Sequence, residues 1–234
     1  MADVLAKLEL SSFPIEEESL LAQYEKLYTA LIYDVLRMEY GIYTVLPSNL
    51  VPLKDGMKVC GIAFTVKGMP DNRSRDEKPE EHEKRARMME AMHKNSIVVW
   101  DTSHDSETAH FGEMMTATAM LRGSIGAIVD GGVRDTNQIM ETGYKIWSRY
   151  RTPVSMYDRH EIVKWQTAIK IGEVTIRPGD VVFADSDGVI IIPRKIAYEV
   201  LQKAQELGKT EKGWREIIAA GVSPSEYIKK GGKL

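Results

Sequence analysis

The N-terminal part of the chain repeats apolar positions with the period of an α-helix. Between residues 16 and 40 the apolar residues that follow this period are Leu20, Leu21, Tyr24, Leu27, Tyr28, Leu31, Ile32, Val35 and Leu36. Side chains at this three- and four-residue spacing share one face of a helix, and the following Gly41 is a typical helix end. The pattern predicts helices over 16–40, and a break near Thr29 would divide the region into two short helices.

The middle of the chain alternates short apolar runs with helical segments. Runs rich in β-branched and aromatic residues are typical of buried strands. They occupy 57–68, 96–101, 126–132 and 144–149. Helical patterns fill 112–123 and 136–143, whereas 102–112 is expected to be a polar connection. A strand, a helix and a second strand in this order predict a right-handed parallel βαβ unit.

The last third of the chain changes to short apolar runs separated by turn residues. Residues 168–193 carry Gly-Glu, Pro-Gly-Asp and Ser-Asp-Gly turns, which predict antiparallel β structure. Residues 195–220 are apolar along one side and predict a long amphipathic helix, with a short helix from Ser223. Because no repeat or flexible linker interrupts the chain, we expect one layered α/β domain over 1–234 with a C-terminal helical tail over 195–234.

The composition is that of a globular protein and gives no sign of a nucleic-acid or membrane partner. Of the 234 residues 43% are hydrophobic and 28% charged, and the net charge of −3 does not attract nucleic acid or an anionic membrane. The only cysteine, Cys60, lies in a predicted strand, so we expect a buried thiol in a reducing compartment. No apolar run reaches the roughly 20 residues of a membrane helix, and the N-terminus lacks a signal-peptide pattern. We therefore expect a cytoplasmic protein.

The predicted βαβ unit places two loops at the carboxyl ends of its strands, where α/β proteins bind ligands. The first loop contains Gly112 and Glu113 at the start of a helix. Unpaired amides at a helix start attract anions, so this backbone could bind an anionic substrate. The amides concerned belong to Gly112, Glu113, Met114 and Met115. The alternative is that Glu113 is only a favourable acid at a helix start.

The second loop contains two glycines followed by opposite charges. Gly131 and Gly132 allow a sharp turn and leave space beside the chain. The Arg134 guanidinium suits bidentate carboxylate binding, and the Asp135 carboxylate is a ligand of the kind that Mg²⁺ or Mn²⁺ takes. The alternative is a surface ion pair between these two side chains, worth under about 1 kcal/mol.

Other polar residues are weaker candidates. One group resembles a metal site, although its spacing matches no standard zinc pattern and favours a solvated loop. It comprises His104, Asp105, Glu107 and His110, of which His110 is the one expected to contact substrate. His82 and His160 are expected at the surface. Residues 69–94 are expected to begin as a mixed-charge loop and to become a helix near Pro79, both solvated, with Arg73 or Arg75 closing over an acidic ligand as the alternative.

The spacing of the two loops resembles a family signature. An acid at Glu113, twenty intervening residues and then Arg134-Asp135 are similar to the acid-x20-Arg-Asp signature of the RraA-like family. That family includes the class II 4-hydroxy-4-methyl-2-oxoglutarate aldolases, which also decarboxylate oxaloacetate, and the ribonuclease E regulator proteins. Further stretches look like the family's early helix, first central strand and β segment. These stretches are 31–41, 56–66 and 172–193, and the resemblance extends over residues 30–207.

The resemblance implies an α/β/β sandwich of the swivelling type, assembled as a homotrimer or hexamer with active sites between subunits. It implies that substrate contacts the backbone of 112–115 and the Arg134 side chain, and that Asp135 holds a divalent cation, Mg²⁺ or Mn²⁺. Glu113 takes the position of an acid, usually aspartate, that holds metal-bound waters in the family aldolases. A neighbouring subunit would supply a further acid. The candidates for it are Glu199, Glu206 and Glu211.

The function that the resemblance implies is carbon–carbon bond cleavage in a 2-oxo acid. The enzyme would cleave a 4-hydroxy-2-oxo acid such as 4-hydroxy-4-methyl-2-oxoglutarate, or oxaloacetate, to give pyruvate. Its catalytic residues would be Arg134, Glu113 and Asp135. The alternative is a protein-binding regulator of the ribonuclease E type without catalysis. A third interpretation is another hydroxy-oxo-acid substrate, because the segment 69–87 could form a different lid.

Overall fold

The computed structural model describes residues 11–229 and residue 231, apart from the side chain of Arg75. Its helices are α2 (Glu17–Tyr24), α3 (Thr29–Tyr40), α4 (Glu80–Glu90), α5 (Glu113–Leu121), α6 (Thr136–Thr142), α7 (Ala197–Ala219) and α8 (Pro224–Lys229). Its strands are β1 (Val51–Pro52), β2 (Val59–Pro70), β3 (Ser96–Asp101), β4 (Ala109–Phe111), β5 (Gly126–Val133), β6 (Lys145–Arg151), β7 (His160–Trp165), β8 (Ile169–Ile171), β9 (Val174–Ile176), β10 (Val181–Asp185) and β11 (Gly188–Ile192). The predicted domain covers 1–234 and the predicted helical tail covers 195–234. Of these ranges, residues 1–10, 230 and 232–234 lie outside the described residues.

Most of the strands belong to one mixed sheet. In this sheet β1, β6, β5, β3, β2, β10 and β11 follow one another, while β4 pairs with β5 and β7 pairs with β2. The strands β2, β3, β5 and β6 are parallel neighbours, and β10 joins β2 in the antiparallel direction. The strands β8 and β9 form a separate antiparallel hairpin. The expected βαβ unit is confirmed, because β3 and β5 are parallel and α5 lies between them in the chain.

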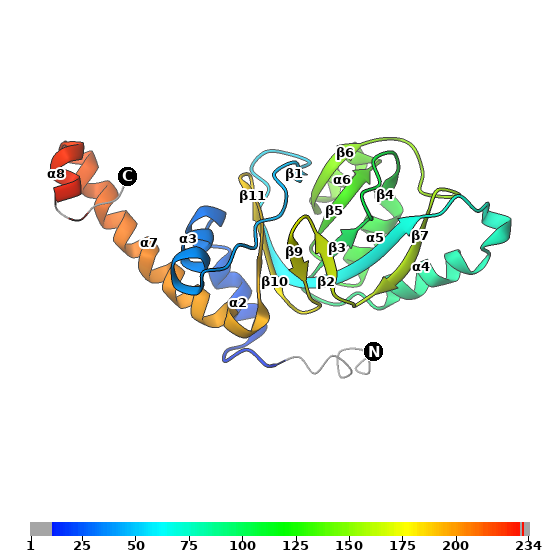
Figure 1. Cartoon of the computed structure of the whole chain (residues 1–234), viewed down its shortest axis with the longest axis horizontal. Coiled ribbons are helices and arrows are strands. Elements are labelled where there is room, and N and C mark those ends of the chain that lie inside the picture. The colour runs from blue at the N-terminus through cyan, green and yellow to red at the C-terminus, as the bar shows by residue number, and fades with distance from the viewer. Residues whose placement is uncertain (1–10, 230, 232–234) are drawn as a thin grey trace.

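The two faces of the β10–β11 hairpin are covered by different parts of the molecule. Alternate residues of a strand point to opposite faces. Val181 and Phe183 therefore pack with the helices α2, α3 and α7, whereas Val182 and Ala184 join the core of the parallel strands. Figure 1 shows these three helices at one end of the molecule and α4, α5 and α6 around the parallel strands at the other. The predicted α/β class is confirmed.

The N-terminal helical region is divided at the expected position. Helix α2 ends at Tyr24 and α3 begins at Thr29. Asp185, at the end of β10, accepts hydrogen bonds from the Thr29 amide at 2.9 Å and from the Thr29 hydroxyl at 2.8 Å. A carboxylate at a helix start satisfies one of the unpaired amides there. The turn between β10 and β11 thus helps to fix where α3 begins.

The long C-terminal helix is also observed, although only part of it is packed. Its buried side chains, Ala197, Val200, Leu201 and Ala204, all lie in its first part. The rest of α7 and α8 extend away from the body of the molecule (Figure 1). No helix among the described residues is long and apolar enough to span a membrane.

Strands β4 and β7 lie outside the segments predicted as strands. Strand β4 lies within 102–112, which was predicted as a polar connection, and pairs in parallel with β5. Strand β7 pairs antiparallel with the end of β2. Each strand is held by a partner distant in the sequence, and each brings a histidine, His110 or His160, into the interior.

Candidate functional site

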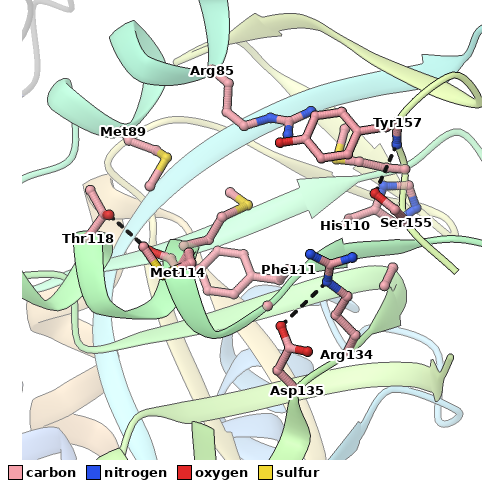
Figure 2. A pocket seen from close by; sticks show the side chains of 14 residues that line it. Arg85, Met89, His110, Phe111, Met114, Thr118, Arg134, Asp135, Ser155 and Tyr157 are labelled. Carbon is pink, nitrogen blue, oxygen red and sulfur yellow. Dashed lines mark hydrogen bonds and ion pairs between the residues drawn. The ribbon is translucent and has the colours of Figure 1, made fainter. Parts of the chain in front are cut away.

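A cavity of about 250 Å³ opens where α5 begins, beside β4 and the end of β5 (Figure 2). It brings together most of the residues singled out in the sequence. These are Gly112, Met114, Met115, Arg134, Asp135 and His110. The two predicted loops therefore meet at one hollow. The side chain of Glu113 is exposed and is not among the groups that line the cavity.

Gly112 allows the two loops to approach each other closely. A β-carbon at this position would lie 2.7 Å from Asp135 Oδ2 and 3.2 Å from Arg134 Cγ. The first distance is too short for a real contact, so a side chain here would have to displace the carboxylate. The small size of Gly112 therefore lets the carboxylate lie against the start of α5.

The side chains of Arg134 and Asp135 turn toward the start of α5. Asp135 Oδ2 accepts a hydrogen bond from the Glu113 amide at 3.1 Å and lies 3.4 Å from Arg134 Nε. The Arg134 amide donates to the Phe111 carbonyl at 3.0 Å, which joins the two loops through the backbone. The two side chains remain 40% and 38% exposed, so both are accessible to a ligand.

The first turn of α5 leaves amides outside the helical hydrogen bonds. The Thr116 amide donates the first intrahelical bond, so the three amides before it have no partner within the helix. One of them, the Glu113 amide, donates to Asp135. The amides of Met114 and Met115, at the positive end of the helix dipole, are the groups that can bind an anion.

His110, the histidine expected to contact substrate, lines the cavity although it is only 1% exposed. Its Nε2 lies 2.7 Å from Asp105 Oδ2. Gly131 makes room for the ring, because a β-carbon there would lie 2.7 Å from His110 Cδ2. Burial lowers the pKa of His110, and the neighbouring Asp105 carboxylate only partly opposes this shift. The ring is therefore neutral at neutral pH, and its Nε2–H donates to Asp105.

The remaining polar residues of this loop do not form a metal site. His104 and Glu107 are exposed, and Glu107 pairs with Arg159 at 3.2 Å. Within the part of the chain that the structure describes, no three His, Cys, Asp or Glu side chains gather to hold a metal ion. The interpretation as a solvated loop fits His104 and Glu107, while Asp105 and His110 form a largely buried pair.

The prediction that His160 lies at the surface is wrong. Its side chain is 1% exposed, and its ring centroid lies 4.3 Å from that of His110. Its Nε2 lies 3.1 Å from the Thr102 carbonyl oxygen. Gly68 makes this position possible, because a β-carbon there would lie 2.2 Å from His160 Cε1. Burial, together with the adjacent His110, lowers the pKa of His160 to about 4.

We expect His160 to make the fold sensitive to mild acid. A histidine in the unfolded chain titrates near pH 6.5, so the unfolded state takes up its proton first as the pH falls. The neutral ring therefore contributes its full stability above pH 6.5. This contribution, about 3 kcal/mol of the free energy of unfolding, is lost as the pH falls from 6.5 to the folded pKa of about 4. Urea denaturation near pH 7 and near pH 5 should show a smaller acid-induced loss for His160→Gln than for wild type. His82→Gln, at a histidine that is exposed as expected, should behave as wild type. Equal losses for His160→Gln and wild type would contradict this assignment.

The charged segment contributes a cation to the cavity, but this cation is not Arg73. Arg73 pairs with Asp71 at 2.7 Å and Glu161 at 3.3 Å and does not line the cavity. The side chain of Arg75 lies outside the described residues. Arg85, on α4, lines the cavity instead (Figure 2).

The glutamates considered as acids from a neighbouring subunit all lie on α7, at the opposite end of the molecule from the cavity (Figure 1). Glu199 accepts a hydrogen bond from the Tyr40 hydroxyl at 3.1 Å. Glu211 accepts from the Tyr28 hydroxyl and pairs with Arg215. Glu206 is exposed. None of the three reaches the cavity of its own chain.

The sequence matches a known family over most of its length. The family model described as "RraA-like: Aldolase/RraA" matches residues 29–191. The chain therefore belongs to the RraA-like family.

Two curated relatives show how far the similarity extends. A protein of Halalkalibacterium halodurans named "Putative 4-hydroxy-4-methyl-2-oxoglutarate aldolase" is 30% identical over 210 residues, covering 88% of this chain and 91% of the relative. Protein DlpA of Legionella pneumophila is 31% identical over 173 residues, which are 74% of this chain. The match spans only 28% of the length of DlpA.

Solved structures share the fold over nearly the whole chain. A crystal structure described as one of novel cellulases from gut-associated microbes is 38% identical, with a TM-score of 0.82, and the match covers 91% of this chain and 96% of that one. Streptomyces coelicolor RraAS2, described as an unusual member of the RNase ES inhibitor RraA protein family, is 25% identical, with a TM-score of 0.74 and coverages of 87% and 99%. The predicted RraA-like α/β fold is confirmed.

Proposed function

We propose that the protein is a divalent-metal-dependent carbon–carbon lyase that releases pyruvate from a 2-oxo acid. Its substrate would be oxaloacetate or a 4-hydroxy-2-oxo acid such as 4-hydroxy-4-methyl-2-oxoglutarate. The observation that carries the proposal is the placement of the Arg134 guanidinium and the Asp135 carboxylate beside the open amides of α5 in one accessible cavity. The name of the Halalkalibacterium halodurans relative supports the same class of reaction.

The cavity offers two kinds of group to a small keto acid. The amides of Met114 and Met115 suit its carboxylate, because a helix start favours an anion. Arg134 suits the keto oxygen and the remaining negative charge. When the C3–C4 bond breaks, its electron pair forms the enolate of pyruvate. A guanidinium already fixed beside the enolate oxygen stabilises that charge without reorganisation.

The donor set at Asp135 fits a divalent cation. A single accessible carboxylate with waters completing the shell is a usual way to hold Mg²⁺, and Gly112 leaves the approach to this carboxylate clear. The described residues offer no cage of three such side chains, which argues against a structural zinc ion. Mg²⁺ or Mn²⁺, when bound, would supply Lewis-acid stabilisation of the keto oxygen. Glu113, whose side chain is exposed, would orient waters around the cation.

We also infer that the enzyme is a homotrimer or hexamer with sites between subunits. On α5, Met114 is 77% exposed and Leu121 is 85% exposed, which is the kind of apolar surface that a partner subunit covers. A partner could supply a base for the proton of the 4-hydroxyl group. Glu199, Glu206 and Glu211 remain the candidates for this base, because none serves the cavity of its own chain.

Two other functions suggested by the relatives fit the cavity less well. Glycoside hydrolysis generally uses two carboxyl groups flanking the scissile bond, whereas Asp135 is the one carboxylate among the described residues lining the cavity. A protein that regulates ribonuclease E would share the fold. Such a protein has no need for an arginine, a carboxylate and open amides in one hollow.

Pyruvate release tests the proposal directly. With Mg²⁺ the protein should form pyruvate from 4-hydroxy-4-methyl-2-oxoglutarate or oxaloacetate. The pyruvate is measured by its reduction in a coupled lactate dehydrogenase assay. Chelation by EDTA should stop turnover, and added Mg²⁺ should restore it. The rate of pyruvate formation with Mg²⁺ but without protein is subtracted as a blank. If neither substrate gives metal-dependent pyruvate above that blank, the lyase proposal fails and inhibition of a ribonuclease E becomes the activity to measure.

A further inference from the structure

One side of the cavity is lined by apolar side chains. Figure 2 shows Met89, from α4, and Thr118, from α5, on the side away from Arg134, with Phe111 between. Met115 of α5 also lines the cavity. Met89 and Met115 are only partly buried, so each keeps surface that a ligand can contact. Together Met89, Phe111, Met115 and Thr118 form the apolar half of the cavity.

The polar groups next to the apolar half are paired within the protein or buried. The Thr118 hydroxyl donates to the Met114 carbonyl at 2.9 Å. The Arg85 side chain is only 11% exposed, its Nε and Nη2 atoms are buried, and the buried Glu81 carboxylate 4.0 Å away supplies its counter-charge. His110 is buried and neutral. A second carboxylate entering this half would therefore lose its hydration without gaining a free cation.

The apolar half extends beyond the place where the keto-acid end would bind. The open amides belong to Met114 and Met115, in the first turn of α5. Thr118 lies three residues after Met115, about 4.5 Å further along the helix axis, and Met89 lines the same space from α4. A ligand that fills this space therefore carries further carbon atoms beyond the keto group.

Met89 and Met115 suit an apolar group of variable shape. A methionine side chain is unbranched and polarisable, so it adapts to different apolar surfaces. Ligand pockets combine such a lining with a few placed polar groups that fix the orientation of the ligand. Here the polar groups are Arg134, Asp135 and the α5 amides, which lie together at one end. The cavity thus matches a ligand with one anionic end and one apolar end.

We propose that the substrate is a 4-hydroxy-2-oxo monocarboxylic acid with an apolar substituent on C4, and that Met89 contacts this substituent. The proposal rests on the lyase function and names the part of the substrate that the cavity selects. The keto-acid end lies against the α5 amides and Arg134, and the substituent lies in the apolar half. Removing the substituent from water favours binding in proportion to the apolar area that is buried.

Cleavage of such a substrate releases pyruvate and an apolar aldehyde. The C3–C4 electron pair forms the enolate of pyruvate, the 4-hydroxyl proton goes to a base, and C4 becomes the aldehyde carbon. The base then returns a proton to C3, which completes the methyl group of pyruvate. The substituent takes no part in these steps, so its contact with Met89 should act on KM rather than on kcat.

Binding of 2-oxo acids that are not cleaved tests the selectivity without turnover. The series pyruvate, 2-oxobutanoate, 2-oxopentanoate and 2-oxohexanoate adds one methylene at a time. In calorimetric titrations with Mg²⁺, each added methylene should tighten binding to wild type by about fourfold. A second pair of ligands compares the far ends, because 5-methyl-2-oxohexanoate carries an isopropyl group where 2-oxoglutarate carries its second carboxylate. The isopropyl compound should bind at least about tenfold tighter.

Variants of Met89 test whether this residue contacts the substituent. Met89→Gln places an amide of similar length in the apolar half. It should weaken 5-methyl-2-oxohexanoate binding by about tenfold and leave pyruvate binding unchanged, whereas Met89→Leu should bind both as wild type does. Met38→Gln is the matched control, because Met38 is exposed on α3 outside the cavity. Thermal unfolding of each variant shows whether it is folded.

Turnover by the same variants separates selection from chemistry. Wild type should cleave 4-hydroxy-6-methyl-2-oxoheptanoate with a higher kcat/KM than 4-hydroxy-4-methyl-2-oxoglutarate. Met89→Gln should raise KM for the first of these substrates with little change in kcat.

The outcomes separate this proposal from the lyase proposal. If 2-oxoglutarate binds as tightly as 5-methyl-2-oxohexanoate, or if binding does not tighten along the series, the selectivity fails even where pyruvate is formed. If folded Met89→Gln binds every ligand as wild type does, Met89 does not contact the substituent. If Met89→Gln does not fold, the wild-type series alone decides. If the selectivity is observed but no 4-hydroxy-2-oxo acid yields pyruvate, the apolar site stands and the lyase function fails.

Discussion

Arg134→Ala should lower kcat/KM for pyruvate formation by roughly 10³-fold without unfolding the protein. The Arg134 side chain is 40% exposed, so its removal leaves no buried charge behind. What is lost is a fixed cation beside the enolate oxygen, and stabilisation of developing charge is usually the largest single term in catalysis. Coupled pyruvate assays of wild type and variant with Mg²⁺, together with their thermal unfolding curves, measure the two effects separately.

Two further variants test whether the effect belongs to the guanidinium itself. Arg134→Lys keeps the charge but loses the planar pair of donors, so its activity should lie between those of wild type and the alanine variant. Arg159→Ala removes an exposed arginine that pairs with Glu107 outside the cavity, and should leave the rate unchanged. Wild-type activity in Arg134→Ala would show that the reaction does not use this cavity.

The pattern of apolar and polar residues was sufficient to predict β3, α5 and β5, which position the two loops of the site. The strands at 96–101 and 126–132 have apolar centres at 97–100 and 127–129, and the helix between them follows a polar loop that contains Gly112. Their order fixes a parallel pair with both loops at one edge of the sheet. The meeting of Gly112 with Arg134 and Asp135 follows from that topology.

Burial of polar residues could not be predicted in the same way. His110 lies in a strand of only three residues, and His160 stands between Arg159 and Glu161, so no extended apolar pattern marks either histidine as interior. Their burial depends on β4 and β7 pairing with distant strands. It also depends on the space left by Gly131 and Gly68. Such space is visible only once the strands are placed side by side.

Arg85 had a sequence signal, although a weaker one than the apolar runs. Residues 81, 85, 88 and 92 follow the i, i+4, i+7 and i+11 spacing of one helical face. Met88 and Met92 on this face are buried, which directs the same face of α4 inward. An arginine on an inward face is usually paired, and Glu81 on the same face lies 4.0 Å from Arg85. The helix itself was predicted from near Pro79, but the mixed charges hid the inward position of Arg85, because most of them belong to the exposed side of α4.

Gly112→Ala is expected to have the second largest effect, about 100-fold on kcat/KM, because small displacements of reacting groups cost about this much. The new β-carbon would lie 2.7 Å from Asp135 Oδ2 and would push the carboxylate away from the Glu113 amide. Metal affinity should fall together with the rate, so raising Mg²⁺ should recover part of the activity. Gly213→Ala on α7, where a β-carbon meets nothing within 4 Å, controls for the substitution itself and should retain full activity. An active Gly112→Ala with unaltered Mg²⁺ dependence would mean that the close approach of the two loops serves folding alone.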